Sequence, residues 1–133
     1  MYGKKIGRYP SLEADREDDK RVERERRVFF EVMGILKPRE IAQGDADGAD
    51  ALAREWAKEN NVPCARYAAL WQTEGLAAGP LRNRRMFKGF DPDGTAAFPG
   101  GRGTADMENV TLDGGAYLVR VLVLEHPTRT RTL

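Results

Sequence analysis

The feature that most constrains the fold is a set of short apolar segments without polar alternation, separated by stretches with helical periodicity. They are a short strand candidate at residues 40–44 and further strand segments at residues 62–69, 95–98 and 117–124. Continuous apolar runs of this length are typical of strands covered on both faces of a sheet. Helices between consecutive strands favour parallel pairing through right-handed crossovers. The sequence therefore predicts an α/β fold, a Rossmann-like layer sandwich with a mostly parallel sheet flanked by helices.

The predicted helices begin with the most charged segment of the chain. Residues 13–27 carry charges of alternating sign, as on a solvated helix face. One apolar stripe runs along this helix until Pro38 ends it, and consists of Val22, Phe29, Val32, Met33 and Leu36. A second helix opens within Asp45–Asp50 and stops at Asn60–Asn61. Further helices are expected over residues 76–90 and 104–112.

Length and composition predict one domain. The chain of 133 residues has 41% hydrophobic and 32% charged residues, which is close to the globular average. We expect a single domain over residues 1–133, with a divergent N-terminal strand and charged helix over residues 1–37 and a flexible tail over residues 126–133. A weak strand signal lies at Lys4–Arg8.

Charge and cysteine content exclude several classes of protein. The 22 Lys and Arg residues nearly balance 21 Asp and Glu residues, so the net charge of +1 gives no field that gathers nucleic acid or lipid. We expect neither a membrane nor a nucleic-acid partner. The single cysteine, Cys64, excludes an intrachain disulfide and a four-thiolate zinc site. With no signal peptide in the sequence, a cytoplasmic location is expected.

Two segments repeat the arrangement of strand, glycine-containing loop and helix start. The first loop is Gly44–Asp50 and the second begins at Pro99 and ends at Asp106. Loops of this kind emerge at the carboxyl edge of a parallel sheet, where ligands of open α/β folds bind. In the second loop, glycines let the backbone approach a ligand, and the following helix offers free N–H groups to an anion. The second loop thus predicts a phosphate cradle, with a plain strand-to-helix turn as the alternative.

The first loop has a different chemistry. Asp45, Asp47 and Asp50 place three carboxylates near one helix N-terminus, where they would repel a bare phosphate. Ribose hydroxyls, or a divalent cation bridging to a phosphate, would suit them better, and helix capping by one aspartate is the simpler alternative. An EF-hand is excluded because, counting from Asp45, positions six and twelve are Asp50 and Trp56, where that loop needs Gly and Glu.

Three arginines follow Gly79–Pro80 on a predicted helix. Arginine suits bidentate phosphate recognition, whereas Arg84 and Arg85 are better explained as a solvated basic face. Neither Cys64, expected to be buried and inert, nor His126, expected to be exposed in the tail, supports a Cys/His hydrolase.

The longest motifs are Trp71-x-x-x-Gly75-x-Ala77-Ala78-Gly79-Pro80-x-Arg82-Asn83 and the run Ala97–Met107. Together with the first loop they resemble the YspA-type, YpsA-related branch of the SLOG superfamily over about residues 40–124. The resemblance implies a Rossmann-like domain that binds a nucleotide or nucleotide-derived ligand such as ADP-ribose or an NAD derivative. Relatives include the Lonely Guy phosphoribohydrolases, DprA and sensor domains of defence systems that read NAD-derived signals.

The resemblance implies a ligand site at the carboxyl edge of the sheet, in a protein that acts as a sensor, carrier or sequestering protein. Its expected residues are Gly44, Asp45, Asp47, Gly48, Asp50, Arg82, Asn83, Pro99, Gly100, Gly101, Arg102, Gly103 and Thr104. Met107 stands where the Lonely Guy pattern has its catalytic glutamate, while Arg82 matches the accompanying arginine. A phosphoribohydrolase-like enzyme that uses Asp106, Glu108 or a metal held by Asp45 and Asp47 is the alternative.

Other departures from the family pattern concern the first loop and the N-terminus. Asp45 and Asp47 replace a glycine and an arginine of the family's first loop, and Gly7-Arg8 is the nearest counterpart of its glycine-serine-arginine strand. A homodimer is compatible with the resemblance, although the sequence does not fix an oligomeric state.

Overall fold

The computed structural model describes residues 12–122, and the chain forms two compact units, residues 1–36 and 37–133. The predicted strand at Lys4–Arg8, the tail over residues 126–133 and His126 all lie outside the described residues. The expectation of a single domain stays a prediction.

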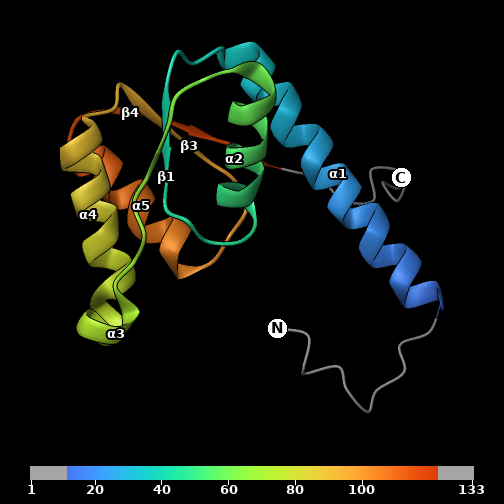
Figure 1. The fold of residues 1–133 in the computed structure, drawn as a ribbon, viewed down its shortest axis with the longest axis horizontal. Helices are drawn as coiled ribbons and strands as arrows, with labels where there is room; N and C mark the ends of the chain where they lie inside the picture. Colours follow the sequence, from blue (N-terminus) through green and yellow to red (C-terminus); the bar gives the residue numbers. More distant parts are fainter. Residues whose placement is uncertain (1–11, 123–133) are drawn as a thin grey trace, which may run out of the picture. The chain divides into compact units, whose positions relative to one another are not determined.

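The first unit contains one long helix, α1, over Leu12–Leu36 (Figure 1). The charged run is therefore a helix, as predicted. Arg21 forms ion pairs with Asp18 at 3.6 Å and Glu25 at 3.5 Å, both exposed and thus weak. Lys37 after the helix has a φ of 46°, and Pro38 prevents its continuation. Among the described helices, including α1, no segment meets the length and hydropathy required to cross a bilayer.

The second unit alternates strands and helices along the chain. Its elements are β1 (Ile41–Gln43), α2 (Ala49–Asn60), β2 (Cys64–Arg66), α3 (Trp71–Glu74), the 3-10 helix η2 (Gly75–Ala77), α4 (Ala78–Phe90), β3 (Gly94–Ala97), α5 (Arg102–Asp113) and β4 (Tyr117–Arg120). The predicted helix over residues 76–90 begins within η2 and continues as α4, and Gly75, at a φ of 59°, ends α3 before it. The α5 helix begins two residues earlier than predicted.

Left-handed residues end two of these helices. Asn61, at a φ of 55°, closes α2 and donates its amide to the Ala57 carbonyl. The same carbonyl also accepts the Val62 amide at 2.9 Å. Asp91, at a φ of 53°, donates its amide to the Phe87 carbonyl at 3.0 Å after α4. Asparagine and aspartate adopt this conformation more readily than other side chains. The helix stop and the turn predicted at these positions are confirmed.

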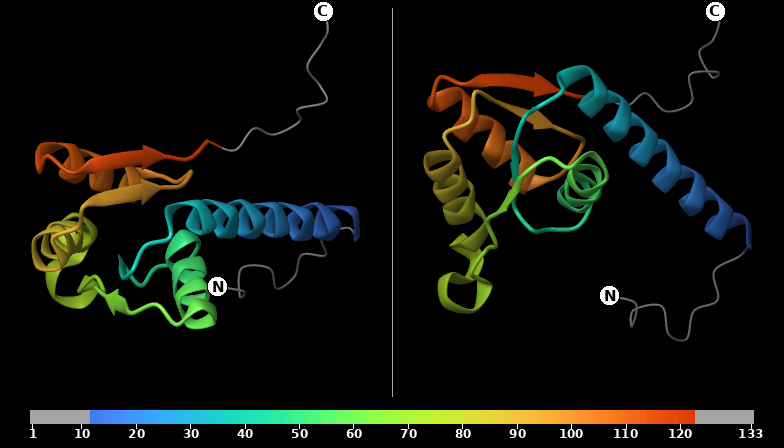
Figure 2. Two further views of the ribbon diagram at one scale, coloured as in Figure 1. Left: turned by 90° about the horizontal axis from the view of Figure 1, so that it is seen from above. Right: turned by 45° about the horizontal axis from the view of Figure 1, so that its top comes forward.

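The strands pair in parallel, as the sequence predicted. Ile41 lies opposite Cys64 in the β1–β2 pair, and Gly94 lies opposite Tyr117 in the β3–β4 pair. The apolar runs of up to eight residues give strands of only three or four residues, and these form two two-stranded sheets. Figure 2 shows α5 beside the β3–β4 pair. The α/β class is therefore confirmed, whereas one layered Rossmann-like sheet is not shown.

The last strand corrects the expectation that every strand is covered on both faces. Tyr117 is 81% exposed and Val119 is 41% exposed. Because side chains alternate between the two faces of a strand, Tyr117 and Val119 share one face of β4, and that face is open to solvent.

The core of the second unit is built from small side chains and one indole. Ala53, Trp56 and Ala57 form the buried face of α2, and Ala78 and Ala97 are buried on α4 and β3. Three polar side chains, Gln43, Asn83 and Thr111, are also buried. Two of these polar residues organise the loops that the sequence singled out.

Candidate functional site

Gln43, at the end of β1, shapes the first loop. Its side chain is 3% exposed, and its Oε1 atom accepts hydrogen bonds from the Asp45 amide at 2.6 Å and from Arg54 Nη1 at 3.2 Å. Asp45 has a φ of 60°, so the chain turns sharply where the strand ends. The buried Gln43 side chain, and not a neighbouring strand, thus accepts the Asp45 amide at this turn.

The three carboxylates of the first loop are not equivalent. Asp45 pairs with Arg54 at 3.3 Å and with Arg66 at 3.7 Å. Asp50 accepts the amide of Ala46 at 3.1 Å through its Oδ2 atom. Asp47 is exposed and makes no hydrogen bond or ion pair within residues 12–122. Two arginines offset the Asp45 charge, which weakens the repulsion of phosphate expected from the sequence.

The aspartates do not cap the following helix. The N-cap residue of α2 is Gly48, at a φ of 73°, and no side chain bonds to the amides of the first turn. Helix capping by an aspartate, the simpler alternative, is therefore wrong. Among the described residues, no group of three or more His, Cys, Asp or Glu side chains is arranged to hold a metal ion.

The second loop is more open than the first. Gly101 is the N-cap residue of α5, again without a side-chain cap, and the first backbone bond of the helix runs from the Ala105 amide to the Gly101 carbonyl at 3.1 Å. A Cβ atom added at Gly101 or Gly103 would meet no atom within 4 Å, whereas one at Gly100 would collide with the Thr104 hydroxyl. Local packing therefore explains Gly100, but it leaves Gly101 and Gly103 to another role.

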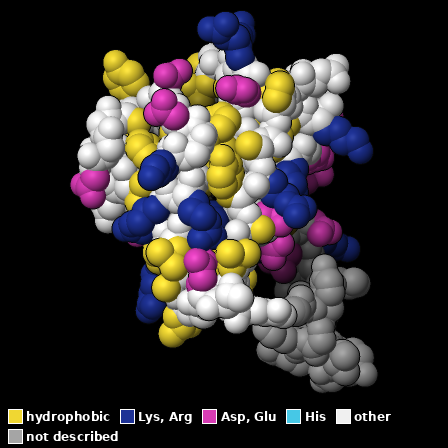
Figure 3. Space-filling model, turned by 60° about the vertical axis from the view of Figure 1, so that its left-hand side comes forward, with side chains coloured by type: hydrophobic (Ala, Val, Ile, Leu, Met, Phe, Trp, Pro, Cys, Tyr) yellow, Lys and Arg dark blue, Asp and Glu magenta, His cyan; other side chains and the backbone are white. Residues whose placement is uncertain are grey.

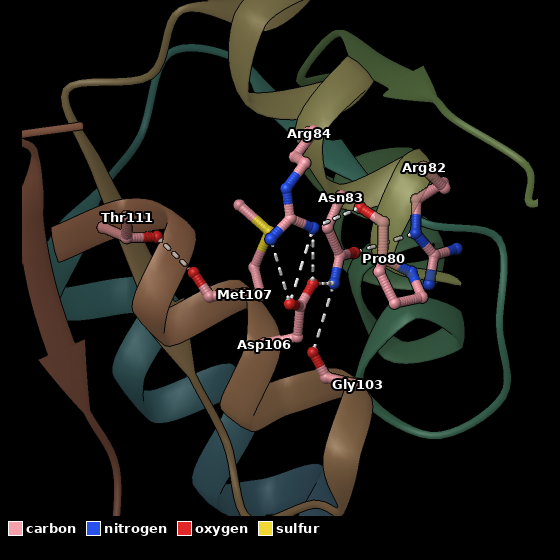
Figure 4. A network of polar contacts seen from close by, with 8 residues as sticks. All are labelled: Pro80, Arg82, Asn83, Arg84, Gly103, Asp106, Met107 and Thr111. Carbon is pink, nitrogen blue, oxygen red and sulfur yellow. Dashed lines mark hydrogen bonds and ion pairs between the residues drawn. The ribbon is translucent and has the colours of Figure 1, made fainter. Parts of the chain in front are cut away.

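Adjacent residues of α4 connect the two loops (Figure 4). Arg82 donates from Nη1 to the Gly44 carbonyl and from Nε to Asn83 Oδ1 at 2.9 Å. Asn83 donates from Nδ2 to the Gly103 carbonyl at 3.3 Å and to Asp106 Oδ2 at 2.9 Å. The structure thus brings the first loop, Arg82, Asn83 and the start of α5 into one hydrogen-bonded group.

The two carboxylates beside Met107 diverge. Asp106 faces α4, where Arg84 lies 3.4 Å from it, and Glu108 pairs with Arg120 of β4 at 2.9 Å. The Met107 carbonyl accepts the buried Thr111 hydroxyl at 2.7 Å. Each carboxylate that could replace the missing glutamate is therefore held by an arginine on a different element.

Arg85, the last of the three arginines of α4, and the Cys64 thiol both interact with groups of the protein itself. Arg85 pairs with Glu74 at 3.0 Å, so the predicted solvated face of α4 carries ion pairs. Cys64 is half-buried, not buried as expected. Burial raises the pKa of the Cys64 thiol, although a hydrogen bond with Gln43 and the charge of Arg54 act in the opposite direction. The surroundings of Cys64 therefore favour the protonated thiol over the reactive thiolate.

The molecular surface shows no extended area of one charge on the face drawn in Figure 3, where basic and acidic side chains are interspersed. Two surface hollows lie elsewhere, one along α1 at residues 23–31 and one at residues 69–73. Neither hollow is lined by the two loops, and the candidate site is defined by loop backbone and hydrogen bonds.

Sequence reasoning missed three residues of this group, namely Gln43, Arg54 and Arg66. A polar residue that ends an apolar strand is a signal that could have indicated Gln43. Arg54 and Arg66 carry no comparable local signal, because they reach Asp45 from α2 and β2.

Comparison with known families bears on the first part of the site. The model of the YspA, cpYpsA-related SLOG family matches residues 35–73, which span β1, the first loop, α2 and β2. This match supports classification as a YspA-type SLOG protein. Neither the curated proteins nor the solved structures gave a match to the chain. Its second loop and α4 lie beyond the matched residues, so their role is argued from their contacts.

Proposed function

We propose that this SLOG protein binds a nucleotide or a nucleotide-derived, ribosyl phosphate ligand at the two loops, as a sensor, carrier or sequestering protein. The observation that carries the proposal is the bridge made by Arg82 and Asn83 between the Gly44 carbonyl and the Gly103 carbonyl. A Rossmann-like layer sandwich, in which the strands share one carboxyl edge, is the arrangement that this proposal favours.

The phosphate would bind at the start of α5. The amides of the first turn have no side-chain cap, and the space above Gly101 and Gly103 is open. Arg82 is linked to this turn through Asn83, which bonds to the Gly103 carbonyl. Its Nε and Nη1 atoms are engaged, and Nη2 has no acceptor within the described residues. A helix N-terminus favours an anion by about 0.3–1 kcal/mol when exposed, and a charge-assisted hydrogen bond adds about 1.5–3 kcal/mol.

The ribose would bind at the first loop. Asp47 is exposed and its carboxylate is unengaged within the described residues, so it is suited to accept hydrogen bonds from hydroxyl groups. Arg54 and Arg66 offset the nearby Asp45, which makes the first loop compatible with a ligand that also carries phosphate. The two loops together suit a ligand with both an anionic and a hydroxyl-bearing part.

Binding without turnover is favoured over the phosphoribohydrolase-like alternative. That alternative requires a carboxylate that is free to act at an N-glycosidic bond. Asp106 is instead bonded to Asn83 and Arg84, and Glu108 is bonded to Arg120. Release of free base from a nucleoside monophosphate, followed by chromatography, would support the enzyme instead.

A thermal-shift screen with AMP, ADP-ribose, NAD and cyclic nucleotides tests the proposal. A ligand at about 100 times its Kd should stabilise the protein by about 2.7 kcal/mol. Gly101→Val should abolish the shift while the melting temperature of the unliganded protein stays close to that of the wild type, because the position faces open space. The proposal fails if none of these compounds shifts the wild-type protein.

A further inference from the structure

Trp71 is an exposed aromatic side chain outside the hydrogen-bonded group of the two loops. It begins α3 and is 59% exposed, whereas the other tryptophan, Trp56, is buried on α2. Within residues 12–122, Tyr117 is the other exposed aromatic residue, and it begins β4. Because ligand-binding loops follow the carboxyl ends of strands, Trp71, which comes after β2, is better placed to serve them than Tyr117.

The strand order places Trp71 on the same side of the second unit as the first loop. β1 and β2 are parallel, so the chain leaves both strands at one edge of the pair. There β1 leads into Gly44, and β2 leads into residues 67–70, which end at the start of α3. Figure 1 shows α3 at the beginning of α4, the helix whose side chains reach both loops.

The indole of Trp71 lies against the helix that carries Arg82 and Asn83. A Cβ atom built on Gly79 would lie 3.6 Å from Trp71 Cη2, so the indole edge faces the first turn of α4. Arg82 and Asn83 follow Gly79 by three and four residues, and residues at these spacings are neighbours on one helix face. Along α4, one helical turn of about 5.4 Å thus separates the indole from the two side chains that bridge the loops.

Trp71 also borders one of the two surface hollows. The hollow is lined by Ala69, Leu70, Trp71, Gln72 and Thr73, which are all uncharged. A phosphate would find no opposite charge among these residues. A nucleobase suits them, because every base has a flat π-face that can stack on an exposed aromatic side chain.

We propose that Trp71 stacks against the base of the nucleotide whose phosphate binds at the start of α5. This inference rests on the proposed function and sharpens it, because it selects ligands with an aromatic base over base-free ribosyl phosphates. In a nucleotide a single sugar separates base from phosphate, which fits a base at the first turn of α4 and a phosphate near Gly103, where Asn83 bonds one turn later. The indole already lies against Gly79, so stacking requires little further ordering.

Calorimetric titration with AMP, ADP-ribose and the base-free ribose 5-phosphate tests this role. Trp71→Ala should weaken the binding of AMP or ADP-ribose about ten- to hundredfold, the size expected for stacking one base on an aromatic side chain. Its affinity for ribose 5-phosphate should stay unchanged. Leu76→Ala, at a 96% exposed leucine of η2, is the matched control and should bind all three compounds as the wild type does. Circular dichroism verifies that both variants are folded.

Fluorescence separates stacking from a purely structural effect of Trp71. The chain has two tryptophans, so Trp71→Phe leaves only the buried Trp56. AMP or ADP-ribose should quench the emission of the wild type. Trp71→Phe should lose this quenching and still bind the nucleotide, because phenylalanine keeps an aromatic face.

The outcomes distinguish this inference from the proposed function. Unchanged affinity of Trp71→Ala for AMP and ADP-ribose, or an equal loss of ribose 5-phosphate binding, would overturn the stacking role and leave the ligand site in place. Quenching that persists in Trp71→Phe would also overturn it. If the wild type binds none of the three compounds, the proposed function fails, and the stacking role fails with it.

Discussion

The first loop, Gly44–Asp50, and the second, from Pro99 into the start of α5, share one sequence arrangement but differ in how their polar groups are satisfied. In the first loop, the protein itself supplies partners for the Gly44 carbonyl and for two of the three carboxylates. In the second, the helix start has no cap, and two glycines face open space. The first loop is therefore closed, because the chain itself satisfies most of its polar groups. The second loop is open and leaves backbone N–H donors for a ligand.

The comparison also indicates where the two loops depend on each other. Arg82 contacts the closed loop and Asn83 contacts the open one, and the two side chains bond to each other at 2.9 Å. If this link holds the open loop in place, perturbing it should affect stability more than changing either loop alone.

The largest effect is expected for Asn83→Ala. Asn83 is 3% exposed and bonds to Arg82, Gly103 and Asp106. Its removal leaves buried partners unsatisfied, so we expect the free energy of unfolding in urea to fall by about 2–3 kcal/mol. Arg85→Ala, which breaks an exposed pair on the same helix, should cost under about 1 kcal/mol. Equal stability of Asn83→Ala and the wild type would show that the loops are not tied through this residue.

Arg82→Ala should separate binding from stability. We expect a ten- to hundredfold loss of affinity, about 1.5–3 kcal/mol, in calorimetric titration with whichever nucleotide shifts the wild type. Loss of the bond to the Gly44 carbonyl should also lower the free energy of unfolding by about 1 kcal/mol. Arg85→Ala again serves as the control and should bind normally. Unchanged affinity in a folded Arg82→Ala protein would remove Arg82 from the site.

A paired glycine experiment contrasts the loops directly. Gly48 has a φ of 73°, so Gly48→Ala should cost about 1–3 kcal/mol of stability. Gly101 has a φ of −101° and open space around it, so Gly101→Ala should change stability by no more than about 0.5 kcal/mol. Thermal unfolding of both variants measures the difference. The contrast between the loops is wrong if the two substitutions are equally costly.

The smallest effect concerns Cys64, which lies beside Gln43 at the base of the first loop. Burial raises the thiol pKa in the folded protein. The protonated thiol thus contributes stability that is complete below the pKa of the unfolded chain and is lost as pH rises through the folded pKa. Alkylation by iodoacetamide, followed by mass spectrometry, should require a higher pH in the native than in the denatured protein. Cys64→Ser supplies the blank, and identical pH dependence in both states would contradict this assignment.

The sequence by itself determined the local elements and the difference between the loops. Helical periodicity indicated α1, α2 and α5, and unbroken apolar runs indicated parallel strands, because both patterns act over a few neighbouring residues. Turn residues such as Asn61 and Asp91 marked helix ends for the same reason. The motif around Arg82 and Asn83 was also visible in the sequence, although not what these side chains contact.

Tertiary structure alone decided which charges meet and which surfaces stay exposed. Arg54 and Arg66 reach Asp45 only because α2 and β2 fold back beside β1, and Asn83 meets Asp106 only because α4 lies beside α5. Likewise, the apolar composition of β4 indicated burial on both faces, but the face that carries Tyr117 and Val119 stays exposed. Such pairings join residues distant in sequence, so their free energy depends on chain packing and not on any local pattern.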